Sequence, residues 1–321
     1  MALAAAYPED RVTLREVGLR DGLQLVKAWP STPQKLQWLT REHAAGVTHF
    51  EIGSFLPASR APQFADVRDL LAFVKENAPG IHASALAMNE RGIDDALSTS
   101  AAEIACVVSA TEEHNQANIR RSLDQAIGLV RYAAARRDEL GHHALISVGI
   151  AMAFGCSISG SVRPSQVLRV VEACLAAGAD IVGVADTVGF AGPDQVFALS
   201  EAIRKLVGSG RFLVHLHDTR GMGIANASAA LDAGCRILDG ALGGLGGCPF
   251  APGATGNVVF EDMAFLCHTK GFDTGIDMDA LIRVREIQRE AMPGETFHGA
   301  LARSGMPKSF GPDAGSEYRG R

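Results

Sequence analysis

Eight short apolar runs, each followed by a helix-like segment, constrain the fold of this chain more than any other feature. They cover residues 12–17, 47–52, 81–88, 103–109, 144–153, 180–185, 212–217 and 236–242, at intervals of roughly 20 to 40 residues. Short runs of this kind are typical of strands in a parallel sheet that is buried on both faces. Eight strands alternating with helices predict an α/β fold, the (β/α)8 or TIM barrel, which needs about 250 residues.

The ends of the helix-like segments support the same alternation. Pro193 opens a helical pattern that stops at Gly208, and Pro164 opens another that stops at Gly178. Proline in the first turn and glycine just past the last turn are usual at helix ends. A doubly wound open sheet is disfavoured because no G-x-G-x-x-G motif follows the first run. We therefore expect an N-terminal extension at residues 1–10, one barrel at 11–272, and a short helical C-terminal extension with a loose tail at 273–321.

Composition and charge exclude several classes of function. The 321 residues are 47% hydrophobic and 21% charged, with a formal net charge of -6. This acidic balance argues against a nucleic-acid partner, and no apolar run reaches the roughly 18 residues that span a membrane. The first ten residues have neither the basic start of a signal peptide nor the arginines of a transit peptide, so a cytoplasmic location is expected. The six cysteines lack C-x-x-C spacing and are interpreted as reduced thiols.

Polar residues gather where the predicted strands end. In a (β/α)8 barrel the active site lies at this end, which we call the mouth. The residues that share this position are Arg20, Asp21, Glu51, Ser54, Asn89, Asp186, Thr187, His215, His217 and Asp218. The opposite ends of the runs show no comparable cluster. We therefore expect one polar site at the mouth.

Part of this set has the chemistry of a metal site. His215 and His217 are two residues apart in a strand, so both imidazoles leave it on the same face. Asp21 adds a carboxylate, and Asn257 could add a carbonyl oxygen. Such a mixed O,N set suits Mg²⁺ or Mn²⁺ and could also take Zn²⁺ or Co²⁺. Two other interpretations stay open: the histidines are ordinary hydrogen-bonded strand residues, and Asn257 caps the helix that follows it.

Two further groups could act on a substrate. Arg20 could polarise a carbonyl or hold an enolate, or it could simply pair with Asp21 or Glu51. Glu51 needs such a partner if it is buried. Cys248 follows a glycine-rich stretch at residues 243–247; it is either a small turn residue or a proton donor on a mobile loop. No lysine stands at the end of a predicted strand, which disfavours a Schiff-base mechanism.

Three segments carry a resemblance to a known family. E-V-G-L-R-D-G-L-Q at 16–24, V-H-L-H-D-T at 214–219 and G-L-G-G-C-P-F-A-P-G-A-T-G-N at 244–257 resemble signature segments of the hydroxymethylglutaryl-CoA lyase family. This family belongs to a superfamily of metal-dependent lyases and synthases with (β/α)8 barrels. F-E-I-G-S-F at 50–55 and D-T-V-G at 186–189 are also similar. The glycine-cysteine loop is the most specific segment, since the related synthases lack it.

The resemblance implies roles for individual residues. A divalent cation would be bound by Asp21, His215, His217 and Asn257. Arg20 would steady the enolate oxygen, Cys248 would be the acid/base, and Glu51 and Glu261 would support the site. Substrate contacts are expected from Arg20, Gln24, Ser54, Asp186 and Thr187.

The implied reaction is a retro-Claisen cleavage of a 3-hydroxy-acyl-CoA. For 3-hydroxy-3-methylglutaryl-CoA the products are acetyl-CoA and acetoacetate, as in leucine catabolism. The metal would lower the pKa of the substrate hydroxyl, and Cys248 would protonate the acetyl-CoA enolate. Because the C-terminal helix could serve a subunit contact, a homodimer or higher homo-oligomer is expected.

Several departures from the family pattern leave the substrate open. Leu19 stands where proline is usual, Leu25-Val26 where Asn-Glu is usual, and 220–222 read Arg-Gly-Met in place of Tyr-Gly-Gln. These positions flank the proposed ligands without replacing them. Alternatives are therefore a lyase for citramalyl-CoA or another branched 3-hydroxy-acyl-CoA, a Claisen synthase of the isopropylmalate type, and a non-catalytic ligand-binding barrel.

Overall fold

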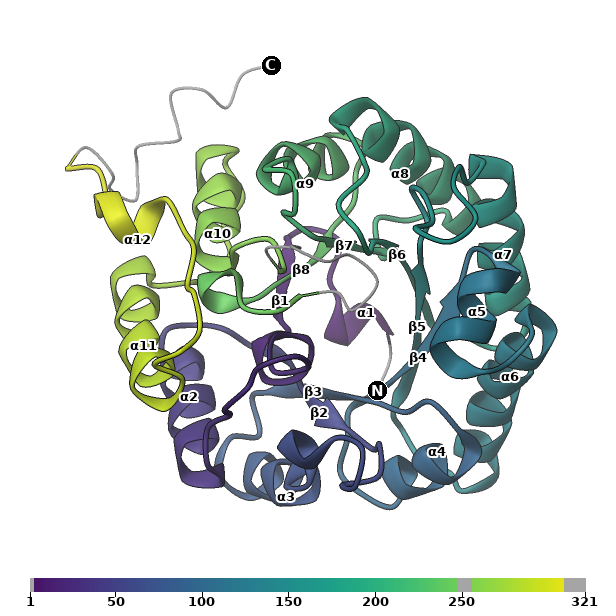
Figure 1. Ribbon diagram of the computed structural model, residues 1–321, viewed down its shortest axis with the longest axis horizontal. Helices are drawn as coiled ribbons and strands as arrows, with labels where there is room; N and C mark the ends of the chain where they lie inside the picture. Colours follow the sequence, from purple (N-terminus) through teal and green to yellow (C-terminus); the bar gives the residue numbers. More distant parts are fainter. Residues whose placement is uncertain (1–2, 248–255, 309–321) are drawn as a thin grey trace.

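Eight parallel strands close into a barrel in the computed structural model, which describes residues 3–247 and 256–308 (Figure 1). The strands are β1 (Thr13–Glu16), β2 (His49–Ser54), β3 (His82–Leu86), β4 (Glu103–Ser109), β5 (Leu145–Ala151), β6 (Ile181–Asp186), β7 (Leu213–Leu216) and β8 (Ile237–Gly240). Strand β1 closes the barrel on β8, with Arg15 opposite Asp239. The predicted (β/α)8 barrel is confirmed, and each predicted run overlaps one strand.

The helices form a ring around the strands in Figure 1. The ring consists of α2 (Thr32–Ala44), α3 (Val67–Asn77), α4 (Glu90–Leu97), α6 (Leu123–Glu139), α7 (Pro164–Ala176), α8 (Pro193–Val207), α9 (Gly223–Asp232) and α10 (Phe260–Thr269). Helix α5 (Glu112–Ile119) and the short turns η2 (Pro62–Phe64) and η3 (Leu242–Gly244) lie in connections. Helices α7 and α8 begin at proline, as predicted, and α8 ends at Gly208 with a φ of 74°.

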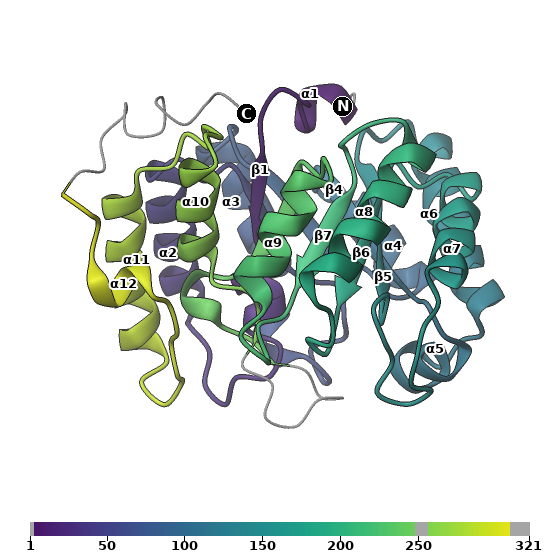
Figure 2. The ribbon, with the colours of Figure 1, turned by 90° about the horizontal axis from the view of Figure 1, so that it is seen from above.

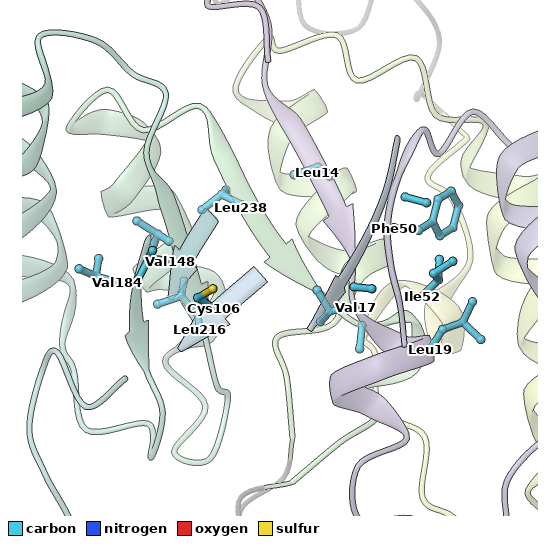
Figure 3. Close-up of a cluster of buried hydrophobic side chains, with 14 of the residues drawn as sticks. Leu14, Val17, Leu19, Phe50, Ile52, Cys106, Val148, Val184, Leu216 and Leu238 are labelled. Carbon is cyan, nitrogen blue, oxygen red and sulfur yellow. The ribbon is translucent and has the colours of Figure 1, made fainter. Parts of the chain in front are cut away.

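The main core fills the space between the strands and the helix ring. Alternate strand residues point outward into this layer. Val148 of β5, Val184 of β6 and Leu216 of β7 are each at most 1% exposed there. Figure 3 shows them with Leu14 of β1 and Phe50 of β2. This packing makes the barrel wall rigid and leaves the inward-facing positions to build the site.

The N-terminal extension covers the end of the barrel opposite the mouth. Helix α1 (Leu3–Ala6) lies at this end in Figure 2. Tyr7, which follows it, is 1% exposed and packs in a cluster with Leu145, Ile181, Leu213 and Ile237. The extension is therefore part of the folded structure and forms the floor of the barrel.

A buried polar network lies just above this floor. Arg15 pairs with Glu103 at 2.8 Å and with Asp239 at 3.1 Å. The other oxygen of Glu103 accepts from the Tyr7 hydroxyl at 2.7 Å and pairs with His82 Nε2 at 3.1 Å. The prediction that this end has no polar cluster is wrong. Tyr7 precedes the first strand and the other residues belong to four separate strands, so only the closure of the barrel brings them together.

The C-terminal extension packs on the outside of the ring. Helix α11 (Met278–Ala291) lies beside α2 and α10, and α12 (Leu301–Ser304) lies near α10 (Figure 1). Leu281 and Val284 are among the buried residues of α11. One face of α11 is thus used within the chain itself. Among the described residues, no helix combines the length and apolar character that crossing a membrane requires.

Candidate active site

A tight turn at the end of β1 carries the first two site residues. Residues Gly18–Gly22 form the π-helical turn η1, in which the amides of Asp21 and Gly22 donate to the Val17 carbonyl at 2.8 and 3.1 Å. A Cβ on Gly18 would lie 2.8 Å from the Trp38 ring and closer still to the Glu16 carboxylate, so this position requires glycine. Such turns are rare and often occur at functional sites. Here the turn places Asp21 among the cavity-lining residues.

Asp21 meets two histidines of β7 and its following residue. His215 Nε2 lies 3.1 Å from His217 Nε2, and Asp21 Oδ2 lies 3.9 and 3.7 Å from these two nitrogens. One ligand atom of each residue falls within 4.8 Å of the others. Two imidazole nitrogens facing one carboxylate oxygen form a donor set that could hold a divalent metal ion. The sequence prediction that these three residues converge is confirmed.

Asn257 completes this group from the chain segment after β8. It pairs with His217 in an antiparallel bridge, and its Nδ2 donates to Asp21 Oδ2 at 2.8 Å and to the Leu245 carbonyl at 3.1 Å. Its Oδ1 is buried and has no hydrogen-bond partner among the described residues. The alternative that Asn257 caps α10 is wrong, because Val259 is the N-cap. A buried amide oxygen without a protein partner fits a fourth ligand.

The electrostatics of Asp21 and His217 favour cation binding. Burial raises the pKa of Asp21, but Arg20, His215 and His217 outweigh it and hold this pKa well below its ordinary value. Burial and the neighbouring His215 lower the pKa of His217 to about 4. Asp21 is therefore ionised and His217 neutral at pH 7. These are the protonation states that a metal requires of its ligands.

Asp239 of β8 is a site residue that the sequence reasoning missed. Its Oδ2 lies 3.1 Å from His215 Nδ1. Burial lowers the pKa of His215, but Asp239 and Asp21 outweigh this effect and the net shift is upward. A carboxylate at Nδ1 favours the tautomer whose Nε2 is free to bind a metal. A lone acidic residue in the middle of a buried apolar run was the available signal.

Arg20 forms ion pairs with both Asp21 and Glu51, the two partners that the sequence offered as an alternative to a role on the substrate. Its guanidinium contacts Asp21 Oδ1 and Glu51 Oε2, each at 2.7 Å. Burial raises the pKa of Glu51, although Arg20 opposes this shift. Both Arg20 and Glu51 line the same cavity as the histidines. The two carboxylates hold the guanidinium in a fixed position, which leaves it able to face a substrate oxygen.

The remaining predicted substrate contacts divide into two groups. Gln24 and Thr187 line the cavity, and Gln24 Oε1 accepts from Arg20 at 3.3 Å. Ser54 donates to the Leu86 carbonyl at 3.3 Å and is not among the lining residues. Asp186 accepts from the amides of Phe190 and Ala191 at 2.7 and 3.0 Å. The contacts of Ser54 and Asp186 favour roles in shaping the backbone below the mouth.

Two further predicted residues lie away from the cavity or outside the described chain. Glu261 is buried, accepts from the Gly243 amide at 3.0 Å and forms an ion pair with Arg285. It thereby anchors the start of the glycine-rich loop. Cys248 lies outside the described residues. The other five cysteines are buried and free, as predicted.

The site opens into a cavity of about 380 Å³. Arg20, Asp21, Glu51, His215 and His217 line its upper part. This volume is in the range of small-molecule binding sites. A carboxylate-imidazole cluster, a fixed guanidinium and a cavity of this size together could bind an oxygen-rich substrate and stabilise negative charge that develops on it.

Comparison with known proteins agrees with this geometry. A family model described as HMGL-like matches residues 11–287. A hydroxymethylglutaryl-CoA lyase of Bacillus subtilis is 33% identical over 89% of this chain and 94% of its own length. An (R)-citramalyl-CoA lyase of Chloroflexus aurantiacus is 37% identical over 85% of this chain and 88% of its own.

Solved structures give the same result. An HMG-CoA lyase from Acinetobacter baumannii, in complex with coenzyme A and 3-methylmalate, superposes with a TM-score of 0.87 and 32% identity. The match covers 95% of this chain and 98% of that one. The family model, the relatives and the barrel with its mouth cluster are thus consistent, and the chain belongs to the HMGL-like family and is a carbon–carbon lyase.

Proposed function

We propose that this enzyme is a divalent-metal-dependent acyl-CoA lyase that cleaves a 3-hydroxy-acyl-CoA by a retro-Claisen reaction. The proposed substrate is 3-hydroxy-3-methylglutaryl-CoA, which would give acetyl-CoA and acetoacetate. The observation that carries the proposal is the convergence of Asp21, His215 and His217 beside Arg20 in one cavity. The relatives named for hydroxymethylglutaryl-CoA and citramalyl-CoA support the acyl-CoA class.

The proposed metal ligands are Asp21, His215, His217 and Asn257. The unpartnered Asn257 Oδ1 and the facing imidazole nitrogens fit this role. A bound divalent ion would supply Lewis acidity, lowering the pKa of the substrate hydroxyl. Mixed oxygen and nitrogen ligands suit Mg²⁺ or Mn²⁺, and two imidazoles also suit Zn²⁺ or Co²⁺.

The protein groups would then guide the bond cleavage. The hydroxyl proton leaves to a general base, the C2–C3 bond breaks, and its electron pair moves onto C2 as the acetyl-CoA enolate. Arg20 would hold the enolate oxygen through its guanidinium, which Glu51 keeps in place at 2.7 Å. A proton is then added at C2. We assign this proton donor to Cys248 on the strength of the glycine-cysteine loop's resemblance to the lyase family.

Product analysis by mass spectrometry tests the reaction. We expect acetyl-CoA and acetoacetate from 3-hydroxy-3-methylglutaryl-CoA with Mg²⁺, and strong inhibition by EDTA that added Mg²⁺ or Mn²⁺ reverses. Activity that survives complete metal removal would contradict the metal-dependent mechanism. Free thiol released from acetyl-CoA plus a keto acid, without cleavage of the lyase substrate, would instead identify a synthase.

Citramalyl-CoA is the second candidate substrate. The relative with 37% identity bears that name, and the departures around Leu19 and Leu25 lie next to the predicted ligands. The same assay with (R)-citramalyl-CoA separates the two candidates. If far more pyruvate forms from (R)-citramalyl-CoA than acetoacetate from 3-hydroxy-3-methylglutaryl-CoA, the mechanism stands and citramalyl-CoA is the substrate.

A further inference from the structure

The C-terminal extension makes direct hydrogen bonds to the turn η3, which follows β8 at the mouth. The Gln288 side chain of α11 donates through Nε2 to the Leu242 carbonyl at 3.2 Å. The backbone amide of His298 donates to the next carbonyl along the turn, that of Gly243, at 2.7 Å. Helix α11 lies outside the helix ring in Figure 1. A segment on the outside of the barrel is thus hydrogen-bonded to a turn at the edge of the site.

A buried ion pair joins the same turn to the extension. Glu261 of α10 accepts from the Gly243 amide at 3.0 Å and pairs with Arg285 of α11. The side chains of Glu261 and Arg285 are 0% and 3% exposed. Arg285 also donates to the His298 carbonyl at 2.6 Å. A buried carboxylate is costly without a cationic partner, so Arg285 is what allows Glu261 to hold the turn.

Close packing leaves η3 little room to move away from the extension. Gly243 and Gly244 have φ values of 70° and 66°, in the left-handed region that favours glycine. A Cβ on Gly243 would lie 2.9 Å from the Phe297 ring. One on Gly244 would lie 3.4 Å from His298 Cβ and 2.9 Å from the Val259 side chain. The position of the turn is therefore set by the extension as well as by the barrel.

The turn in turn holds the side chain of Asn257. Leu245 directly follows η3, and its carbonyl accepts from Asn257 Nδ2 at 3.1 Å. The same nitrogen donates to Asp21 Oδ2 at 2.8 Å. A Cβ on Gly256 would lie 2.5 Å from the Gly244 carbonyl oxygen, so the two segments are in direct contact. Because the nitrogen and oxygen of an amide lie at a fixed angle, the place of the Leu245 carbonyl sets the direction of Asn257 Oδ1.

We propose that Arg285 and Gln288 are positioning residues, which hold η3 and thereby direct Asn257 Oδ1 toward a bound divalent ion. The inference rests on the proposed function, in which Asn257 is a ligand of that ion. A ligand whose direction is fixed beforehand loses less conformational entropy on binding, so the ion is bound more tightly. The C-terminal extension then serves the metal site as well as the packing of the helix ring.

The variant Gln288→Met tests the contact to the Leu242 carbonyl. Methionine has nearly the length and volume of glutamine but cannot donate this hydrogen bond. We expect the affinity for Mn²⁺, measured by isothermal titration calorimetry, to fall by about three- to tenfold, the lower end of what losing the outer partner of a ligand causes. Turnover should fall at limiting Mn²⁺ and recover at saturating Mn²⁺, because the groups around a filled site are unchanged.

Arg285 offers a graded pair of variants. Arg285→Met leaves the Glu261 carboxylate without its cation and should weaken Mn²⁺ binding by about tenfold or more. Arg285→Lys keeps a cation beside Glu261 and should restore most of the wild-type affinity. If Arg285→Met does not fold, the result for Gln288→Met decides by itself.

The matched control is Val284→Ala on the same helix. The Val284 side chain is buried, at 3% exposure, but it is apolar and cannot hydrogen-bond to η3. This variant should lower the melting temperature while the Mn²⁺ affinity stays at the wild-type value. If Val284→Ala and Gln288→Met lose the same affinity at similar melting temperatures, any loosening of α11 has this effect and the inference is overturned.

The outcomes separate the inference from the proposed function. Wild-type Mn²⁺ affinity in a folded Gln288→Met protein overturns the inference and leaves the metal-dependent lyase standing. No Mn²⁺ binding by the wild-type protein overturns the proposed metal site and the inference with it.

Discussion

At the scale of single residues, the site depends on the carboxylate of Asp239, which belongs to none of the sequence motifs. Asp239 bridges His215 Nδ1 and the Arg15 guanidinium, each at 3.1 Å. It therefore fixes the orientation of one imidazole of the mouth cluster. It also links that cluster to the polar network above the floor. Partners of this kind make a histidine a better ligand by fixing its tautomer and raising its basicity.

Replacing Asp239 should weaken metal binding without removing a ligand. Asp239→Asn keeps the shape of the side chain but removes the charge beneath His215. We expect the affinity for Mn²⁺, measured by isothermal titration calorimetry, to fall by about tenfold or more. Asp232→Asn is the control, since this half-exposed carboxylate of α9 pairs with Lys270 at 2.8 Å and does not line the cavity. Wild-type affinity in Asp239→Asn would show that His215 is oriented by other contacts.

His49 makes folding stability depend on pH. Burial and the nearby His82 lower the pKa of its imidazole to about 3, while the unfolded chain keeps a value near 6.5. Below pH 6.5 the unfolded state takes up a proton that the folded state does not, so the free energy of unfolding falls as pH falls. The loss between pH 7.5 and 5.5 is about 1.4 kcal/mol for this residue.

The variant His49→Gln isolates this effect. Glutamine can still donate to the Ala6 carbonyl, which His49 Nε2 contacts at 3.0 Å. Urea unfolding of both proteins at pH 7.5 and 5.5 should show a smaller acid-induced loss of stability in the variant. Equal losses in the two proteins would mean that His49 is protonated in the folded state at pH 5.5.

The residues that could be predicted from sequence are those whose signal is local. His215 and His217 are two residues apart in one predicted strand, so their side chains share a face. Asp21 follows the end of another predicted strand, so it was expected at the same mouth of the barrel. Arg15 belongs to the first strand and Asp239 to the last. Their pairing depends on the closure of β1 on β8, which no local spacing encodes.

At the scale of secondary structure, the π-helical turn η1 positions two of the site residues. Its five residues Gly18–Gly22 contain both Arg20 and Asp21. The sequence predicted a strand ending at residue 17 but not this turn, because its cause is the lack of space around Gly18. The Glu16 carboxylate and the Trp38 ring occupy the place of a Cβ. Similarly, the sequence left open whether Asn257 is a metal ligand or the cap of the next helix, and the structure makes Val259 the N-cap and pairs Asn257 with His217.

Gly18→Ala should therefore damage the site and the fold together. The new methyl group would lie 2.8 Å from Trp38, which forces the turn or the ring to move. We expect a loss of about 1–3 kcal/mol in the free energy of unfolding, and lower turnover because Arg20 and Asp21 shift. Urea unfolding and steady-state kinetics measure both. Gly128→Ala is the control and should stabilise α6 slightly; a similar result for Gly18→Ala would contradict the crowding argument.

At the scale of the whole molecule, barrel closure unites residues from the two ends of the chain. Asp21 follows β1 and His215 lies in β7, and both of these strands pair with β8 in the closed barrel. The fold could be predicted because each of the eight strands coincides with an apolar run in the sequence. The floor could not, because residues 3–7 contain no pattern that distinguishes a plug from a loose extension. The role of these residues becomes visible only in the closed barrel, whose end opposite the mouth they cover.

The floor supplies the last prediction. Tyr7 fills the base of the barrel and donates to Glu103 at 2.7 Å, so Tyr7→Ala removes a large buried side chain and a hydrogen bond. We expect the free energy of unfolding to fall by about 3–5 kcal/mol, whereas Tyr7→Phe, which keeps the ring, should lose only about 1 kcal/mol. Thermal and urea unfolding measure both. If the two variants lose the same amount, the hydroxyl and not the packed ring holds the floor, because only the hydroxyl is missing from both proteins.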